Sequence, residues 1–210
     1  LGAEGLKHVT EMAILNANYL ASSFEKLGFK ILFKGKQGRV GHEMIWDCSA
    51  FNKEYGISEL DIAKRLMDFG FHAPTLSFPV HGTLMVEPTE SEPKEELDRF
   101  IEALKTIREE MCEVAEGKAD KTDNVLKNAP HTHKVLTADE WTHTYPRSKA
   151  AYPLPSSRTR RRWVWRPQPD VYLRSALRLC ERRKLKIGRS YFNPGTVEAE
   201  SRDFFAKQPI

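Results

Sequence analysis

The sequence lacks any apolar run near the ~20 residues that a membrane-spanning helix needs, and it lacks the Cys-x-x-Cys pairs of a zinc knuckle. Its cysteines are few, odd in number and far apart: Cys48, Cys112 and Cys180. This spacing indicates neither a structural zinc site nor a disulfide framework. We therefore expect reduced thiols in an intracellular compartment.

The N-terminus lacks an initiating methionine and the basic-then-apolar pattern of a signal peptide. A start at Leu1 leads us to expect that an upstream part of the protein is missing. The zinc-protease motif is absent, because His42-Glu43 is not followed by the second histidine of His-Glu-x-x-His. His131 and His133 stand two residues apart without an obvious third ligand, so we expect no metal site.

The charge of the chain is divided unevenly along its length. Hydrophobic residues make up 40% and charged residues 30%, which predicts a modest core with some chain outside it. The net charge of +4 combines +9 in residues 156–210 with −5 in residues 1–155. An asymmetry of this size indicates a boundary near residue 156.

Helical periodicity is clearest in three segments. Residues 3–27 repeat apolar side chains at helical spacing up to Gly28, a natural stop. Ser58 is a plausible N-cap for a helix ending at Gly70. The apolar stripe expected for that helix consists of Leu60, Ala63, Leu66 and Met67. A third helix, capped by Thr89 or Ser91, extends to about Gly117. Its expected inner face consists of Leu97, Phe100, Ile101, Leu104, Ile107 and Met111.

Short apolar segments between these helices predict strands. Residues 29–33 and 40–48 indicate two strands joined by a glycine turn, and residues 83–86 indicate another that ends at Pro88. A further extended piece lies between Pro74 and Pro79. The order of elements predicts an α+β fold, with a small mixed or antiparallel sheet covered by helices on one side.

Residues 61–92 carry the most distinctive sequence, DIAKRLMDFGFHAPTLSFPVHGTLMVEPTESE. This segment closely resembles the signature of the glycine-cleavage P protein, a pyridoxal-phosphate decarboxylase of glycine. Residues 2–6, 13–19 and 126–131 agree as well, so the resemblance covers residues 2 to about 155. It implies the small C-terminal domain of an aspartate-aminotransferase-like (fold type I) enzyme. The family usually has an arginine near Ser49, which this chain has lost.

The resemblance implies glycine decarboxylation on pyridoxal phosphate, with transfer of the aminomethyl group to a lipoyl carrier (H) protein. That chemistry needs a lysine that holds the coenzyme and a loop that binds its phosphate, and neither is recognisable here. We therefore expect pyridoxal phosphate in the complete enzyme, none bound by this fragment, and no activity of the fragment alone. The implied partners are the remainder of P protein or a second subunit, and the carrier. The family works in the mitochondrial matrix of eukaryotes or the cytoplasm of bacteria.

Five residues are candidates for lining the cleft of the complete enzyme: His72, Thr75, Glu87, Thr89 and Glu90. Each has a structural alternative. A lone histidine such as His72 is usually hydrogen-bonded within the fold, and the threonine hydroxyls suit turns and caps. The acidic residues would stabilise the start of the following helix. We assign no catalytic, cofactor-binding or metal-binding residue.

We expect three parts: a domain over residues 1–117, an irregular wrapping arm over 118–155, and a basic tail over 156–210. The tail mixes arginines with Trp163 and Trp165, a pattern that suits nucleic acid. A non-enzymatic α+β module that binds nucleic acid is therefore the alternative function, and the small domain of a transaminase is a third possibility. Under the main interpretation we expect neither membrane nor nucleic-acid binding. Codons chosen for residues 164–170 spell YGDRNL when they are read one base later, and this string resembles the P-protein C-terminus. We therefore interpret the tail as disordered or derived from a frameshift.

Overall fold

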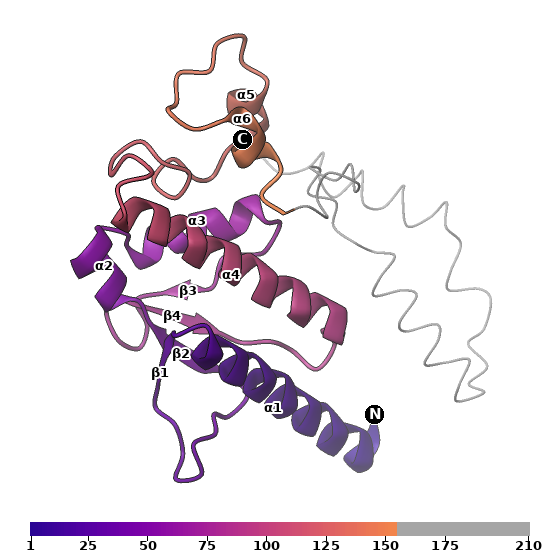
Figure 1. Cartoon of the computed structure of the whole chain (residues 1–210). Helices are drawn as coiled ribbons and strands as arrows, with labels where there is room; N and C mark the ends of the chain where they lie inside the picture. Colours follow the sequence, from indigo (N-terminus) through magenta and orange to yellow (C-terminus); the bar gives the residue numbers. More distant parts are fainter. Residues whose placement is uncertain (155–210) are drawn as a thin grey trace, which may run out of the picture. The chain divides into compact units, whose positions relative to one another are not determined.

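The computed structural model describes residues 1–154 (Figure 1). The basic tail and the frameshift hypothesis lie outside the described residues. The long helices are α1 (Gly2–Lys26), α3 (Glu59–Asp68) and α4 (Lys94–Ala115). The short helices are α2 (Ser49–Tyr55), α5 (His133–Leu136) and α6 (Arg147–Ala151). The strands are β1 (Lys30–Leu32), β2 (Met44–Asp47), β3 (Thr75–Leu76) and β4 (Thr83–Val86).

The four strands form one antiparallel sheet in the order β1-β2-β4-β3. Trp46 in β2 pairs with Ile31 in β1 and with Leu84 in β4. Leu84 also pairs with Leu76 in β3, so these side chains share one face of the sheet. The expected small sheet is confirmed, and β3 is an edge strand of this sheet.

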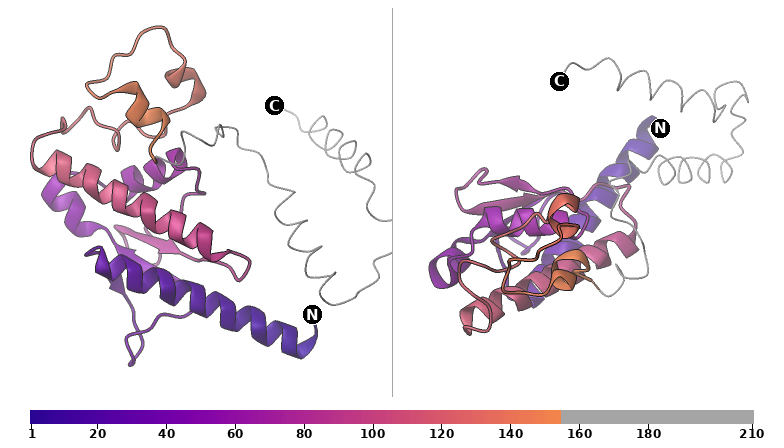
Figure 2. Two further views of the ribbon diagram at one scale, coloured as in Figure 1. Left: turned by 45° about the vertical axis from the view of Figure 1, so that its right-hand side comes forward. Right: turned by 90° about the horizontal axis from the view of Figure 1, so that it is seen from above.

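The helices α1, α3 and α4 cover one face of the sheet (Figure 2). The side chains on this face include Trp46 and Leu84, which are fully buried members of the main hydrophobic cluster. Ile45 lies on the opposite face, because neighbouring side chains of a strand alternate. It is outside that cluster. The fold is therefore a two-layer α+β domain, as expected.

Local sequence explains where the long helices end. Gly28 terminates α1 in a left-handed conformation (φ 79°), and its N–H donates to the carbonyl of Glu25 at 2.9 Å. Ser58 caps α3, since Ser58 and Asp61 form a reciprocal capping box. The cap expected for α4 is wrong. Pro93 occupies the N-cap position, and the Thr89 and Ser91 hydroxyls bond to each other at 2.7 Å.

The predicted apolar faces are largely correct. Most side chains of the α4 stripe are buried, whereas Ile101 is only partly buried. On α3 the stripe is shifted, because Leu60 and Met67 are 44% and 46% exposed whereas Ile62 and Leu66 are fully buried. An aromatic cluster joins the layers. The ring of Phe24 on α1 lies 5.5 Å from that of Trp46 and 5.9 Å from that of Phe100 on α4.

Residues 118–154 are mostly irregular but pack on the helical layer. Val125 and Leu126 belong to the main hydrophobic cluster, and Ala150 on α6 is fully buried. Asn124 holds the local turn by accepting from the N–H groups of Leu126 and Lys127, both at 3.0 Å. This segment therefore adds to the core even though it shows no helical or strand period.

Candidate functional site

The five residues proposed to line a cleft divide into two groups along the chain. His72 and Thr75 lie before and within β3, and Glu87 directly follows β4. Because Thr75 pairs with Met85 in the antiparallel ladder, these three residues come from the same end of the β3–β4 pair. Thr89 and Glu90 lie further along the loop that leads to α4. We call these five residues the wall.

The position of His72 is fixed by contacts of the preceding residue, Phe71, rather than by contacts of the His72 side chain. The ring of Phe71 lies 4.9 Å from the ring of Phe100 and 3.6 Å from the guanidinium carbon of Arg99. Arg99 also donates to the carbonyl of Phe69 at 2.7 Å. His72 itself is exposed and has no polar partner among residues 1–154. Within the described part of the chain His72 therefore makes no hydrogen bond, and its role stays a prediction.

Glu87 and Thr75 are also open to solvent. Oε1 of Glu87 lies 3.7 Å from Nε2 of His42, and both side chains are more than half exposed. Thr75 lies on the edge strand, and its hydroxyl has no hydrogen-bond partner within residues 1–154. Ser77 instead serves the turn: it donates to Glu59 at 2.8 Å and accepts from the N–H of Gly82 at 3.3 Å. Ser77 therefore stabilises this turn, and the hydroxyl of Thr75 takes no part in it.

The loop that carries Thr89 and Glu90 is fixed to α1. Nδ2 of Asn16 donates to the carbonyl of Thr89 at 2.8 Å and to that of Glu92 at 3.4 Å. Asn16 is buried, whereas Thr89 and Glu90 are exposed. Burial and the nearby Glu96 raise the pKa of Glu92, although Arg99 opposes this shift. All five wall residues are exposed, and no hydrogen bond or ion pair joins any two of them within the described chain.

The position that departs from the family pattern lies away from the wall. The N–H and hydroxyl of Ser49 donate to Oδ1 of Asp47 at 3.0 and 2.6 Å. A Cβ placed on Gly82 would lie 3.7 Å from the Cβ of Ser49. Gly82 precedes β4, whereas Glu87 follows it, so Ser49 is near the other end of that strand.

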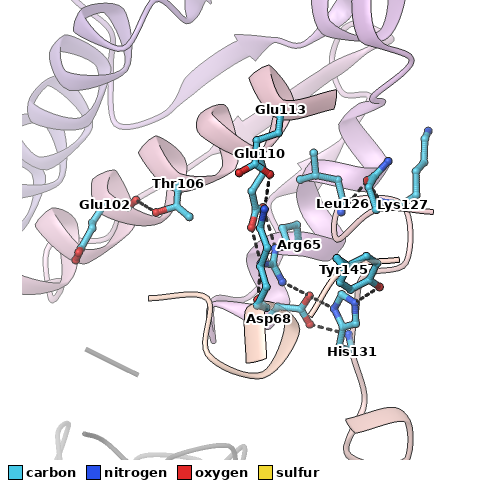
Figure 3. A network of polar contacts seen from close by, with 12 residues as sticks. Arg65, Asp68, Glu102, Thr106, Glu110, Glu113, Leu126, Lys127, His131 and Tyr145 are labelled. Atoms are coloured by element: carbon cyan, nitrogen blue, oxygen red, sulfur yellow. Dashed lines mark hydrogen bonds and ion pairs between the residues drawn. The ribbon is translucent and has the colours of Figure 1, made fainter. Parts of the chain in front are cut away.

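A buried polar network lies on the helical layer (Figure 3). Arg65 on α3 donates to Glu110 on α4 at 3.0 and 2.6 Å, and to Asp68 at 2.9 Å. It also donates to the carbonyl of Lys149 at 3.1 Å. Burial alone would lower the pKa of Arg65, but the carboxylates of Glu110 and Asp68 raise it above its ordinary value. The guanidinium therefore stays charged and joins α3, α4 and α6.

His131 attaches the irregular arm to this network. Its backbone N–H donates to Oδ1 of Asp68, and its Nδ1 lies 2.7 Å from Oδ2 of the same carboxylate. Its Nε2 lies 2.7 Å from the hydroxyl of Tyr145. Burial raises the pKa of Tyr145 to about 12, so this hydroxyl keeps its proton near neutral pH. Both ring nitrogens are thus occupied, and His131 has a structural role.

The other histidines of this region do not complete a metal site. His143 bonds to Asp123 at 2.8 Å, and His133 is exposed on α5. No cluster of three or more potential ligands occurs in the described residues. Sequence reasoning missed Arg65, Asp68 and Glu110, because charged residues on a helix are normally solvated.

Domains of this class, a small antiparallel sheet with helices on one face, serve many functions, so fold alone decides nothing further. A family model described as "Glycine dehydrogenase, C-terminal domain" matches residues 9–131. The glycine dehydrogenase (decarboxylating) of Bordetella avium is 58% identical over 163 residues, which is 78% of this chain and 17% of that protein. The Bacteroides fragilis protein of that name is 57% identical over 164 residues, with the same coverage of each chain. The Akkermansia muciniphila protein is 58% identical over 154 residues, 73% of this chain and 16% of that protein.

The chain belongs to the glycine dehydrogenase C-terminal domain family. The resemblance inferred from residues 61–92 is therefore confirmed, and the comparisons give the nucleic-acid and transaminase alternatives no support. The chain spans less than a fifth of the length of these relatives, 16–17%. Within residues 1–154, no helix has the length and apolar character to span a bilayer.

Proposed function

We propose that this chain is the C-terminal domain of a pyridoxal-phosphate-dependent glycine decarboxylase and completes an active site that lies mainly in the rest of the enzyme. The observation that carries the proposal is the 58% identity to glycine dehydrogenase over 163 residues. The exposed wall supports it, because His72 and Thr75 have no side-chain polar partner within residues 1–154 and are available to a neighbouring domain.

The wall does not fit pyridoxal phosphate by its own residues. It offers one imidazole, two hydroxyls and two carboxylates, but no amine for the aldehyde and no cradle of backbone N–H groups for the phosphate. Two exposed carboxylates would repel a phosphate dianion. The wall suits cationic groups, such as the ammonium of glycine, better. We therefore propose that this chain alone holds no coenzyme and is inactive, and we derive no step through the coenzyme.

The wall residues would contribute polar contacts at one side of the shared cleft. His72 can donate or accept a proton, because neither ring nitrogen has a partner within residues 1–154. Glu87 can hold a cationic group, and in this structure Nε2 of His42 lies 3.7 Å from its carboxylate. Thr75 can donate a hydrogen bond from the sheet edge. These are the roles we propose for them in orienting substrate.

The partners follow from the proposed activity. The first is the remainder of the glycine dehydrogenase polypeptide, or a second subunit that supplies it. The second is the lipoyl carrier protein that accepts the aminomethyl group. We propose a bacterial cytoplasmic setting over a mitochondrial one, because the relatives cited above come from bacteria.

Complementation tests this function. The Bordetella avium enzyme, truncated before the region matched by this chain, is purified and mixed with the full 210-residue chain. Release of labelled carbon dioxide from glycine is measured with pyridoxal phosphate and lipoyl carrier protein. We expect no release from either part alone and release from the mixture. Carbon dioxide release by the chain alone, or an inactive mixture, would contradict the proposal.

A further inference from the structure

A buried polar side chain on α1 holds the loop that joins β4 to α4. Asn16 is 5% exposed, and the other buried residues of α1 are apolar. Its Nδ2 donates to the carbonyl of Thr89 at 2.8 Å and to the carbonyl of Glu92 at 3.4 Å. An amide nitrogen carries two hydrogens, so both donors of Asn16 are used on this loop. The loop is therefore tied to the helix at two points.

Glu90 lies between these two tied carbonyls. The N–H of Glu92 also donates to the carbonyl of Thr89, at 3.4 Å, and this hydrogen bond closes residues 89–92 into a turn. Glu90 is the first of the two central residues of the turn, and its side chain is exposed. The carboxylate of Glu90 has no polar partner within residues 1–154. A turn that is anchored on both sides therefore presents a carboxylate to solvent.

Helix α4 does not use Glu90 at its start. The acidic residues in the first turn of α4 are Glu95 and Glu96, and the N-cap residue is Pro93. Within residues 1–154, Glu90 accepts no hydrogen bond from an N–H group of this helix. Binding residues are commonly carried by loops that a rigid scaffold holds in position. The anchored turn and its unused carboxylate fit that arrangement.

We propose that Asn16 is a positioning residue for Glu90, and that it holds the turn of residues 89–92 so that the Glu90 carboxylate contacts a cationic group in the shared cleft. This inference rests on the proposed function, in which the wall lies at that cleft. Without the amide of Asn16, the carbonyls of Thr89 and Glu92 lose their attachment to α1. Glu90 then samples many positions. A charged group that is already in place stabilises a reacting complex more than a mobile one, because it needs no reordering.

A double-mutant cycle tests this inference, because a positioning residue acts only through the group that it positions. The complemented Bordetella avium enzyme is assayed for carbon dioxide release over a range of glycine concentrations. The 210-residue chain is supplied as wild type, Asn16→Leu, Glu90→Gln or the double variant. We expect each single variant to lower kcat/KM at least ~10-fold, the size of a lost hydrogen bond to a charged group. When Glu90→Gln is already present, Asn16→Leu should change kcat/KM less than ~2-fold.

Asn124 provides a matched control for the loss of a buried amide. It is also buried, and its Nδ2 donates to two carbonyls, that of Asp120 at 2.8 Å and that of Lys121 at 3.3 Å. These contacts lie in the irregular arm rather than at the wall. Asn124→Leu should therefore lower the urea midpoint, as Asn16→Leu does, but change kcat/KM less than ~2-fold. An equal loss of kcat/KM in Asn124→Leu would mean that destabilisation alone explains the effect of Asn16→Leu, and the inference would be wrong.

A measurement on the chain alone tests whether Asn16 holds the turn. Relaxation of backbone ¹⁵N nuclei gives an order parameter for each residue, about 0.85 for a rigid backbone and below about 0.6 for a flexible one. We expect Glu90 to be rigid in the wild-type chain and flexible in Asn16→Leu. If Asn16→Leu does not fold, Asn16→Ser takes its place, because serine is too short to reach both carbonyls. A flexible Glu90 in the wild type, or a rigid one in the variant, would overturn the inference.

The remaining outcomes separate this inference from the proposed function. If the wild type restores carbon dioxide release but the effects of the two single variants add in the double variant, Asn16 acts only through the fold. The inference is then wrong and the proposed function stands. Unchanged kcat/KM in Glu90→Gln would have the same consequence. If the wild type restores no release, the proposed function fails and the inference fails with it.

Discussion

The guanidinium of Arg65 on α3 donates two hydrogen bonds to the carboxylate of Glu110 on α4, at 3.0 and 2.6 Å. Both side chains are buried. Such a pair stabilises less than its geometry suggests, because both charges lose their hydration. Removing one partner is far more costly, since the other charge is then left buried and uncompensated.

We therefore predict that Arg65→Met lowers the free energy of unfolding by about 3–5 kcal/mol. The substitution leaves Glu110 and Asp68 buried without their shared cation. Urea denaturation measures the change. Lys30→Met is the control, because Lys30 pairs with Asp47 at a 71% exposed position and should change stability by about 0.5 kcal/mol or less. Equal stability of the two variants would contradict the prediction.

His131→Phe tests whether the irregular arm is attached through this network. The substitution leaves Asp68 with the backbone N–H of residue 131 but without the ring. We expect a loss of about 1–3 kcal/mol in unfolding free energy and faster hydrogen exchange across residues 118–154. His133→Phe, at an exposed position only two residues away, should leave both measurements unchanged. Unchanged exchange in His131→Phe would show that other contacts hold the arm.

The sequence predicted those helices and strands that show a regular pattern of apolar residues within one continuous segment. The strand over residues 83–86 matches β4, and helices α1 and α4 were predicted to within a few residues, because their apolar side chains repeat at regular spacing. Helix α2 was missed, since Phe51 is its one buried residue and no period is visible in seven residues. The α4 cap was misassigned because Thr89 and Ser91 resemble caps, whereas their hydroxyls bond to each other.

The buried network could not be predicted, because it depends on contacts distant in sequence. His131 and Asp68 are 63 residues apart, and Arg65 and Glu110 are 45 apart. In the sequence, a histidine two residues from another histidine resembles a metal site or part of a loop. Only the folded chain shows that Asp68 and Tyr145 occupy both of its ring nitrogens. The wall was named from the family resemblance, whereas its exposure became visible only in the structure.

Asp123 gives a prediction for acidic pH. Burial alone would raise its pKa, but hydrogen bonds from Thr144, His143 and Asn128 lower the pKa to about 2. Because the folded pKa lies below the unfolded value near 3.8, Asp123 stabilises the fold above that unfolded value, and the stabilisation is lost as the pH falls toward about 2. We expect the urea midpoints of wild type and Asp123→Asn to differ near neutral pH and to converge as the pH falls from about 4 to about 2. A constant difference throughout would contradict the pKa assignment.

Cys48 should be inert in the native protein. Its side chain is fully buried, and burial, reinforced by Glu59 and Asp47, raises the pKa of its thiol above the ordinary range. Alkylation requires an accessible thiolate, so we expect Cys48 to react only when the domain unfolds. Mass spectrometry of iodoacetamide-treated peptides measures this, with the partly exposed Cys112 as the internal control. Equal rates for the two cysteines without denaturant would contradict the burial of Cys48.

Wall variants separate a role in the cleft from a role in folding. His72 is exposed and has no polar partner within residues 1–154, so His72→Ala should change the urea midpoint of this chain very little. If the imidazole faces substrate in the complemented enzyme, the same variant should lower carbon dioxide release about 10²-fold or more, as expected for loss of a positioned acid–base group. His81→Ala is the matched control, because His81 is also exposed but lies at the other end of the β3–β4 pair. Only the histidine that faces substrate should affect carbon dioxide release. Equal activity of the His72→Ala and His81→Ala variants would therefore contradict a role of His72 in the cleft.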